Sequence, residues 1–441
     1  MKATILLAAP IVITQLAHIS LSFVDTVMVG RLGPAALAGV ALGNTVFFNT
    51  LMFCMGLLMA VGPMVSHAFG AGDHEVIGRS VRQGLWMTLC LSAIAIPIVM
   101  NGGTILKWLG QSDENAALAG SYLFAIGWGV FPFLGFIALR SFVEAVSRPK
   151  IVTAIALGGV FVNIALNYVL MYGKFGFPAM GLVGTGWASA IVYTIDFLLL
   201  LIYIAKQKAF SEYRIFSRLG KPDSHYFREL FRIGYPIGSS MGIEMSLFML
   251  TVIMMGWIGT TQLAAHQVAI QCAAFTFMVP LGIGMATSVR VGQAVGRRDD
   301  LGKTVAGYVG IGLSTLFMFL TAVVFWLVPR FVVGIYLDIQ DPQNLLVVDL
   351  AVRLLFLAAI FQVFDGIQVA TMGALRGMKD TKTPMKIAMF SYWAVGLVTG
   401  YILAFPLGYE EEGLWIGLVM GLATAATLLL RRFYTLSHPS A

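Results

Sequence analysis

The sequence predicts an all-α integral membrane protein of twelve transmembrane helices, arranged as two pseudo-symmetric lobes of six helices each. Of the 441 residues, 59% are hydrophobic and only 11% are charged, whereas a soluble domain typically has about 25% charged residues. So few charges could not cover a soluble surface of this size. Apolar stretches of the roughly 20 residues that a membrane helix requires recur along the whole chain, separated by short polar loops.

The first apolar stretch follows Met1 and Lys2 and could be mistaken for a secretory signal, because it has a basic head and a hydrophobic body. It is longer than the apolar part of a signal peptide and contains Pro10, Gln15 and Asp25. It also lacks a convincing cleavage site of small residues. We therefore expect it to be the first membrane span.

The remaining spans follow one another with Gly, Pro and charged residues at their ends. The longest polar loop comes after the sixth span. It divides the chain into an N-terminal lobe of residues 1–205, a cytoplasmic linker of residues 206–232 and a C-terminal lobe of residues 233–441. The predicted spans are 3–29, 36–64, 84–107, 117–142, 151–172, 182–205, 233–258, 262–288, 304–328, 349–375, 386–406 and 412–431.

Basic residues are concentrated in alternate loops. This distribution is the positive-inside pattern, and it places both termini in the cytoplasm. The net charge of +7 therefore indicates membrane orientation, and we expect no nucleic acid as a partner. The basic loops hold Arg79, Arg82, Arg148, Lys150, Lys206 to Arg232, Arg297, Arg298, Lys303, Arg376, Lys379 and Lys382, whereas the opposite loops hold little beyond Arg31, Lys107, Lys174 and Arg330.

The second half of the chain repeats the first. A shift of 226 positions (256 minus 30) aligns spans 1 and 2 with spans 7 and 8 without a gap. The spacing of the matches favours a duplication over the general enrichment of Gly in membrane helices. Two repeats in the same order imply an axis close to the membrane normal and a molecule that can work by alternating access. The aligned residues include Gly30, Gly33, Leu37, Gly56, Met59, Gly70 and Asp73, which match Gly256, Gly259, Leu263, Gly282, Met285, Gly296 and Asp299.

Three carboxylates lie within the predicted spans: Asp25 in span 1, Glu244 in span 7 and Asp365 in span 10. An Asp at the centre of a membrane helix costs about 2.5 to 3.5 kcal/mol on insertion scales. None of the three has a Lys or Arg within one helical turn. For each, the alternative is a structural carboxylate that is hydrogen-bonded to Ser, Thr or Asn of a neighbouring helix.

A carboxylate inside the membrane becomes tolerable when it takes a proton, a metal cation or a cationic substrate. Competition among these is what an antiporter requires. Asp25, Glu244 and Asp365 are therefore the candidate ion-coupling residues, and Glu244 and Asp365 are the candidates for a metal-cation site.

Amides in the spans are candidates for coordinating the substrate or the ion. Asn163 and Asn167 are four residues apart and share a helix face, where they could bind an ion or donate to Asp25. Hydrogen bonding between helices explains them equally well. Gln267 and Gln362 have the same ambiguity, although Gln362 lies one turn before Asp365 and is the better candidate.

Two further carboxylates, Asp196 in span 6 and Glu144 at the inner end of span 4, are weaker candidates. Near a membrane interface a side chain can reach water. We therefore expect both to be structural.

Three stretches resemble the multidrug and toxic compound extrusion (MATE) family, and the likeness extends over essentially the whole chain. The surroundings of Glu244 and Asp365 resemble the NorM branch of bacterial drug/sodium antiporters. The second stretch is the most specific. The stretches are FVDTVMVGRLG (23–33), VPLGIGMATSVRVGQAVG (279–296) and LRGMKDTKTPM (375–385).

The resemblance implies a two-lobed, outward-opening V and the export of organic cations such as fluoroquinolones and dyes. It also implies the exchange of these cations for inward-moving Na⁺ or H⁺, with Asp25, Glu244 and Asp365 matching the acids of the family. Glu244 and Asp365 are then the candidates for a Na⁺ site. Asn163 and Asn167 match its polar pair in span 5. The second position is an Asp in some proton-coupled relatives, so Asn167 favours Na⁺ without excluding H⁺.

Two other functions are considered. A lipid-linked oligosaccharide flippase of the same superfamily would need a strongly cationic cavity, for which Arg353 is the only plausible residue. An integral membrane enzyme would need a nucleophile with a base, and no such constellation occurs within the spans. We expect no cofactor beyond the coupling ion, membrane lipid as a partner, a monomer, and a location in the inner (plasma) membrane.

Overall fold

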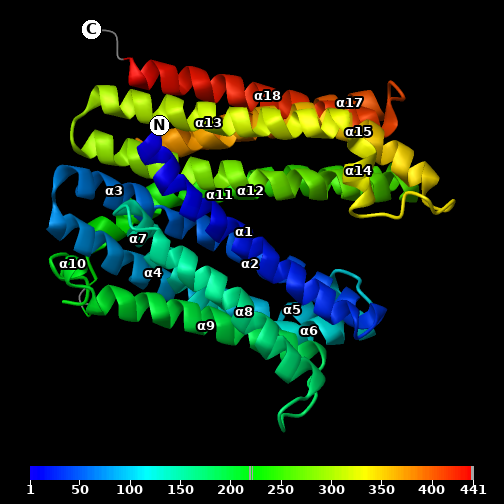
Figure 1. Cartoon of the computed structure of the whole chain (residues 1–441), viewed down its shortest axis with the longest axis horizontal. Coiled ribbons are helices and arrows are strands. Elements are labelled where there is room, and N and C mark those ends of the chain that lie inside the picture. The colour runs from blue at the N-terminus through cyan, green and yellow to red at the C-terminus, as the bar shows by residue number, and fades with distance from the viewer. Residues whose placement is uncertain (218–219, 221, 439–441) are drawn as a thin grey trace. The chain divides into compact units, whose positions relative to one another are not determined.

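A computed structural model describes residues 1–217, 220 and 222–438. The described residues are helical along most of their length, as predicted (Figure 1). Arg218 and Lys221, which the prediction assigns to the linker, lie outside the described residues.

The chain forms two compact units, which we call the N-unit (residues 13–238) and the C-unit (residues 1–12 and 239–441). Helices α1 (Lys2–Gly30) and α11 (Ser224–Ile258) contribute to both units. Helix α11 begins inside the predicted linker, because the carboxylate of Asp223 accepts hydrogen bonds from the N–H groups of His225 and Tyr226 and caps the first turn.

The N-unit is a bundle in which α9 is central and contacts α6, α7 and α8. Between α1 and α11 its helices are α2 (Pro34–Met59), α3 (Val61–Ala71), α4 (His74–Met100), α5 (Gly102–Trp108), α6 (Asp113–Gly127), α7 (Val130–Ala145), α8 (Lys150–Tyr172), α9 (Leu182–Lys206) and α10 (Lys208–Ser211).

The C-unit is built around α15, which packs on α12, α13 and α18 (Figure 1). Its core contains Leu354, Leu355, Phe361 and Trp415. Beyond α11 its helices are α12 (Thr260–Gly296), α13 (Asp300–Leu327), α14 (Pro329–Gly334), α15 (Leu345–Gly377), α16 (Lys382–Met389), the π-helix η1 (Phe390–Leu397), α17 (Val398–Ala404) and α18 (Glu410–Ser437).

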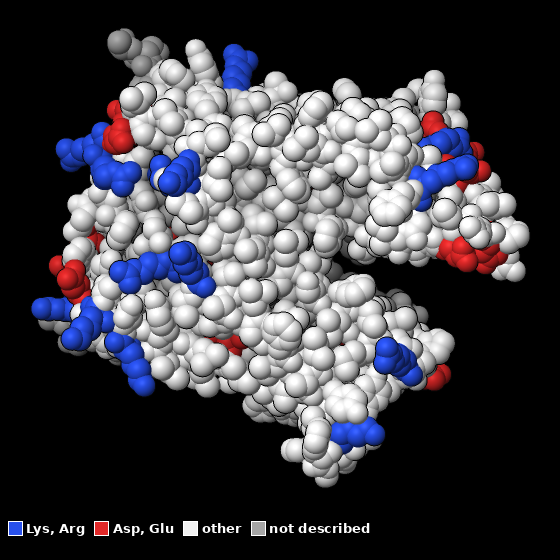
Figure 2. All heavy atoms as spheres, viewed as in Figure 1, with Lys and Arg blue, Asp and Glu red and all other residues white. Residues whose placement is uncertain are grey.

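The predicted membrane class is confirmed. Eleven helices among the described residues are long and apolar enough to cross a membrane, with α2 and α3 taken as one and α16 to α17 as one. The pair α6 and α7, bent by 52°, brings the number to twelve if it forms one span. In Figure 2, Lys and Arg side chains lie toward the ends of the helices, and the helix sides on the visible face are almost free of charge.

Several helices are longer than the predicted spans. Helix α4 begins at His74 and α11 at Ser224, in each case well before the apolar part of the helix. The predicted boundaries were wrong here because hydropathy marks the part of a helix that suits lipid, whereas polar turns continue the helix beyond it.

The repeat is visible in matching helix starts. Asp73 precedes α4 and accepts a hydrogen bond from the N–H of Val76, and its aligned partner Asp299 precedes α13 and accepts from the N–H of Gly302. The backbone angles agree as well, with φ of −90° at Asp73 and −97° at Asp299. The repeats differ where helices are interrupted: α2 and α3 are separated at Ala60 whereas α12 is continuous, α6 and α7 are separate whereas α15 is continuous, and α8 is continuous whereas α16 and α17 are joined by η1.

Glycines allow the helices around α15 to approach closely. A side chain at Gly373 on α15 would meet the carbonyl oxygen of Gly284 on α12. Gly417 on α18 lies equally close to the backbone of Gly400 on α17. Such contacts between backbones are typical of membrane bundles, where packing rather than the hydrophobic effect holds helices together.

Candidate ion and substrate sites

The N-unit holds Asp25 in a cluster formed by α1, α8 and α9. Asn167 on α8 donates to Oδ1 of Asp25 at 2.6 Å, and the hydroxyl of Ser189 on α9 donates to Oδ2 at 3.0 Å. The same amide of Asn167 also donates to Oδ1 of Asn163 at 3.0 Å. All four side chains are buried. The predicted contact between the Asn pair and Asp25 is therefore present.

The cluster has unused hydrogen-bonding atoms. Nδ2 of Asn163 and Oδ1 of Asn167 are buried without a partner among the described residues. The groups that hold Asp25 are neutral, so nothing in them offsets its negative charge when it is ionised. The site thus offers oxygen ligands from a carboxylate and an amide, and one of these oxygens has no hydrogen-bond partner among the described residues. Such ligands suit a small hard cation or a proton.

Glu144 was expected at an interface and is instead buried. Arg140, one turn earlier on α7, donates to its carboxylate at 2.7 Å. Arg140 also donates to Oε1 of Gln15 on α1 at 2.6 Å. An ion pair between helical neighbours, and not contact with water, therefore accommodates Glu144, and its structural role stays a prediction.

Asp196 was also expected to reach water, and this prediction was wrong. Its side chain on α9 is only 5% exposed. A Cβ at Gly159 of α8 would lie 3.0 Å from both of its carboxylate oxygens. Its Oδ1 has no hydrogen-bond partner among the described residues. The predicted span 182–205 already places Asp196 nine residues from the nearer end, and the packing of α8 against α9 encloses it.

The C-unit brings Glu244 of α11 and Asp365 of α15 within electrostatic reach of each other. Asp365 is buried and Glu244 is partly buried. Arg376, three turns after Asp365 on α15, also acts electrostatically on Glu244. Among the residues that the structure describes, no hydrogen bond or ion pair joins Glu244 to Arg376.

The two predicted glutamines have different surroundings. Gln362 is fully buried, and its Oε1 accepts from the hydroxyl of Thr276 on α12 at 2.9 Å. Gln267 is exposed and lies nine residues before Thr276 on the same helix, or roughly 13 Å along its axis. The structure therefore places Gln362 beside the α12–α15 contact near Asp365, and it does not bring Gln267 there.

Sequence reasoning missed Ser189, Arg376 and Tyr392. Arg376 is eleven residues after Asp365, which is three turns, so helical periodicity could have placed both on one face. Tyr392 lies in η1 and interacts electrostatically with Glu244 and Asp365. No pattern in the sequence marks a π-helix, and a lone Ser in an apolar span has no distinguishing signal.

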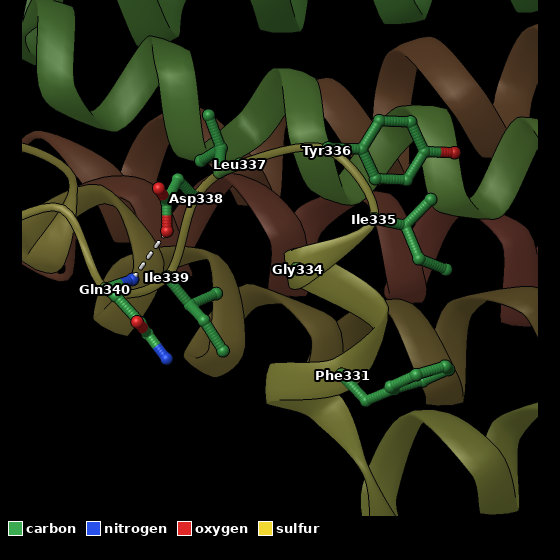
Figure 3. A pocket seen from close by; sticks show the side chains of 8 residues that line it. All are labelled: Phe331, Gly334, Ile335, Tyr336, Leu337, Asp338, Ile339 and Gln340. Carbon is green, nitrogen blue, oxygen red and sulfur yellow. Dashed lines mark hydrogen bonds between the residues drawn. The ribbon is translucent and has the colours of Figure 1, made fainter.

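A hollow of about 570 Å³ is lined by α14 and the segment that follows it. Figure 3 shows the side chains around it, which come from Phe331 and residues 334–340, and the hydrogen bond that the N–H of Gln340 donates to Asp338 at 2.9 Å. None of the predicted site residues lines it. The hollow is therefore not a candidate for the ion site.

The fold is shared with known transporters. A structure titled an outward-facing conformation of a multidrug resistance MATE family transporter of the MOP superfamily is 20% identical, with a TM-score of 0.90, covering 99% of this chain and 95% of that one. The eukaryotic MATE transporter AtDTX14 is 22% identical, with a TM-score of 0.87, covering 98% of this chain and 94% of that one.

Curated relatives match over nearly their whole length. A probable multidrug resistance protein NorM from Mesorhizobium japonicum is 41% identical, covering 98% of this chain and 93% of the relative. A protein of the same name from Synechococcus sp. is 40% identical with the same coverage. The family described as MatE matches twice, at residues 10–169 and 236–402, and the two starts are separated by the offset found in the internal repeat. These matches cover most of the chain, which therefore belongs to the MatE family.

Proposed function

We propose that this protein is a multidrug efflux transporter that exports organic cations in exchange for inward-moving Na⁺ or H⁺, by alternating access of its two units. Asp25, Glu244 and Asp365 act as the ion-coupling acids. Curated relatives named as multidrug resistance proteins support the substrate class.

The observation that supports coupling most strongly is the setting of Asp25. It is buried and is held by the neutral donors Asn167 and Ser189. A carboxylate in such a place is stabilised when a proton or Na⁺ neutralises it. Occupation by the ion changes the charge of the N-unit, and this change can favour one access state over another.

The C-unit supplies the second pair of acids. Glu244 and Asp365 interact electrostatically, so a cation that binds near one also favours the ionised form of the other. A cationic drug and a Na⁺ ion would both be attracted to the pair, with Gln362 as a further oxygen ligand. We place the Na⁺ candidate site at these two acids.

A one-for-one exchange of a monovalent cationic drug for Na⁺ or H⁺ moves no net charge, so the concentration gradient of the ion drives it. Each net elementary charge that a higher ion stoichiometry carries inward adds about 2.3 kcal/mol per 100 mV. This addition corresponds at equilibrium to a roughly fiftyfold accumulation of the drug outside the cell. We place the protein in the inner membrane with both termini in the cytoplasm, as a monomer that needs no cofactor.

A flippase for lipid-linked oligosaccharides is the alternative, and the surroundings of Arg353 disfavour it. Arg353 forms ion pairs with Glu411 at 3.7 Å and Glu412 at 3.3 Å. Its charge is therefore already matched by two carboxylates and is a poor receptor for a diphosphate. A membrane enzyme is disfavoured because the relatives are named as resistance proteins and transporters.

Ethidium efflux from proteoliposomes tests the proposal, with a Na⁺ gradient and a pH gradient imposed separately. We expect the parent to move ethidium under at least one gradient, and Asp25→Asn, Glu244→Gln and Asp365→Asn each to reduce the rate by about tenfold or more. Asp349→Asn is the matched control, because Asp349 forms an exposed pair with Arg330. Parental rates in all three variants would remove these acids from the mechanism.

A further inference from the structure

We propose that Asp196 is a second cation-binding station in the N-unit, through which the coupling Na⁺ or H⁺ passes between Asp25 and the Lys206 end of α9. This proposal rests on the proposed function. It adds a carboxylate that neither the predicted ion-coupling set nor the Asp25 cluster includes.

The first argument is burial without a partner. Asp196 is only 5% exposed, and its Oδ1 has no hydrogen-bond partner among the described residues. Among the described residues, Tyr193 interacts electrostatically with Asp196. No Lys or Arg of these residues does so. A buried polar atom is normally satisfied. A buried carboxylate oxygen without a hydrogen bond is suited to binding a cation reversibly.

The second argument is the bare helix surface that faces Asp196. Gly159 on α8 leaves room for the carboxylate, since a Cβ there would lie 3.0 Å from both oxygens. Gly159 is one turn from Asn163, which is one turn from Asn167. The face of α8 that holds the Asp25 cluster thus continues directly to Asp196.

The third argument is alignment along α9. Ser189, which donates to Asp25, is seven residues before Asp196 and therefore on the same face, roughly 10 Å away along the axis. Tyr193 lies between them and interacts electrostatically with both Asp25 and Asp196. Two carboxylates that are both within electrostatic reach of one tyrosine offer successive positions for a small cation.

The direction of movement follows from the ends of α9. Lys206 ends this helix, and the loop after it is the most basic of the chain, which the positive-inside pattern assigns to the cytoplasm. Asp196 is nearer to that end than Ser189 is. It would therefore receive the cation from Asp25 and release it inward.

The principal test is Asp196→Asn in proteoliposomes. Asn keeps the size and hydrogen-bonding capacity but cannot take a charge, so a merely structural Asp196 would tolerate it. We expect ion-driven ethidium efflux to fall by about tenfold or more, with ethidium binding to the purified protein unchanged. Thr194→Val is the control on the same helix, because the Thr194 hydroxyl donates to the carbonyl of Ala190 in its own turn.

A pair of adjacent glycines provides an independent test. Gly159→Ala places a methyl group against both oxygens of Asp196 and should also reduce efflux. Gly158→Ala adds the same methyl group where nothing lies within 4 Å and should leave efflux at the parental rate. Equal rates in both Ala variants would contradict a role for the Gly159–Asp196 contact.

Chemical labelling separates this proposal from the function itself. Dicyclohexylcarbodiimide reacts with protonated carboxyl groups in apolar surroundings, and mass spectrometry of the Asp196 peptide measures the product without any transport. Suppression of labelling by Na⁺ but not by choline identifies Na⁺ as the cation. Labelling that Na⁺ does not suppress, and that persists near neutral pH where an ordinary Asp is ionised, identifies H⁺. Labelling that Na⁺ does not suppress and that is confined to acidic pH, or parental efflux by Asp196→Asn, overturns the proposal. Absence of efflux in the parent would instead refute the proposed function.

Discussion

At the scale of single residues, the acids of the two units have different electrical surroundings. Asp25 is held by neutral amide and hydroxyl donors, whereas Glu244 has Arg376 within electrostatic reach. The built-in cation opposes the binding of a second cation at Glu244. We therefore expect the N-unit site to retain its ion more strongly than the C-unit site.

Removing the amide of Asn167 should weaken the Asp25 cluster. Asn167→Ala deletes a donor to an acidic group, and hydrogen bonds to charged groups contribute about 1.5 to 3 kcal/mol. We expect a lower thermal midpoint for the purified protein and weaker Na⁺ protection of Asp25 from carbodiimide. Asn101→Ala is the control, because its amide is exposed and bonds to the carbonyl of Pro97 in its own helix. A midpoint as high in Asn167→Ala as in the control would contradict the assigned hydrogen bond.

Removing the charge of Arg376 should strengthen the binding of cations in the C-unit. Arg376→Gln leaves Glu244 without this nearby positive charge, so the dissociation constant of ethidium should fall by roughly three- to tenfold. Arg330→Gln, which removes a charge from an exposed ion pair with Asp349, should leave it unchanged. Weaker ethidium binding in Arg376→Gln would show that Arg376 supports the site instead of opposing it.

At the scale of helices, apolar pattern predicts where a span lies but not how its helix ends or bends. The predicted span 117–142 contains the 52° bend between α6 and α7, and the predicted span 386–406 contains the π-helix η1. Both depend on packing against neighbouring helices, which a pattern of hydropathy does not encode. The caps at Asp73 and Asp299 were foreseeable, since both occupy aligned positions and Asp is a preferred N-cap.

The close approach of α12 and α15 can be tested with matched glycines. Gly373→Ala places a methyl group against the carbonyl oxygen of Gly284, and overpacking of this kind typically costs about 1 to 3 kcal/mol. We expect a lower thermal midpoint. Gly312→Ala on α13 meets nothing within 4 Å and should leave the midpoint unchanged or raise it, because Ala is a better helix former than Gly. A destabilised Gly312→Ala with an unaffected Gly373→Ala would contradict this packing.

At the scale of the whole molecule, the sequence predicts the membrane class, the internal repeat and the carboxylates within the spans, because each has a strong physical signal. A charged side chain inside the hydrocarbon core is costly, so Asp25, Glu244 and Asp365 could be recognised in the apolar spans. The Ser189 hydroxyl could not, because it becomes a neighbour of Asp25 only when α9 packs in a particular rotation. Arg376 was readable only in part, since periodicity places it on the face of Asp365 but not within reach of Glu244 on α11. The burial of Asp196 was hidden for the same reason, since Gly159, which makes room for it, has no distinctive signal in an apolar span.

The orientation in the membrane is open to a direct test on α13. This helix has 28 residues and is therefore roughly 42 Å long, which exceeds the roughly 30 Å hydrocarbon core. Its two flanking loops must lie on opposite sides. In a background without native cysteines, a membrane-impermeant maleimide should label Gln340→Cys in intact cells and Arg298→Cys only after permeabilisation. Labelling of Arg298→Cys alone in intact cells would reverse the orientation, and the ion pathway proposed through Asp196 would then lead outward, against the inward flow that drives export.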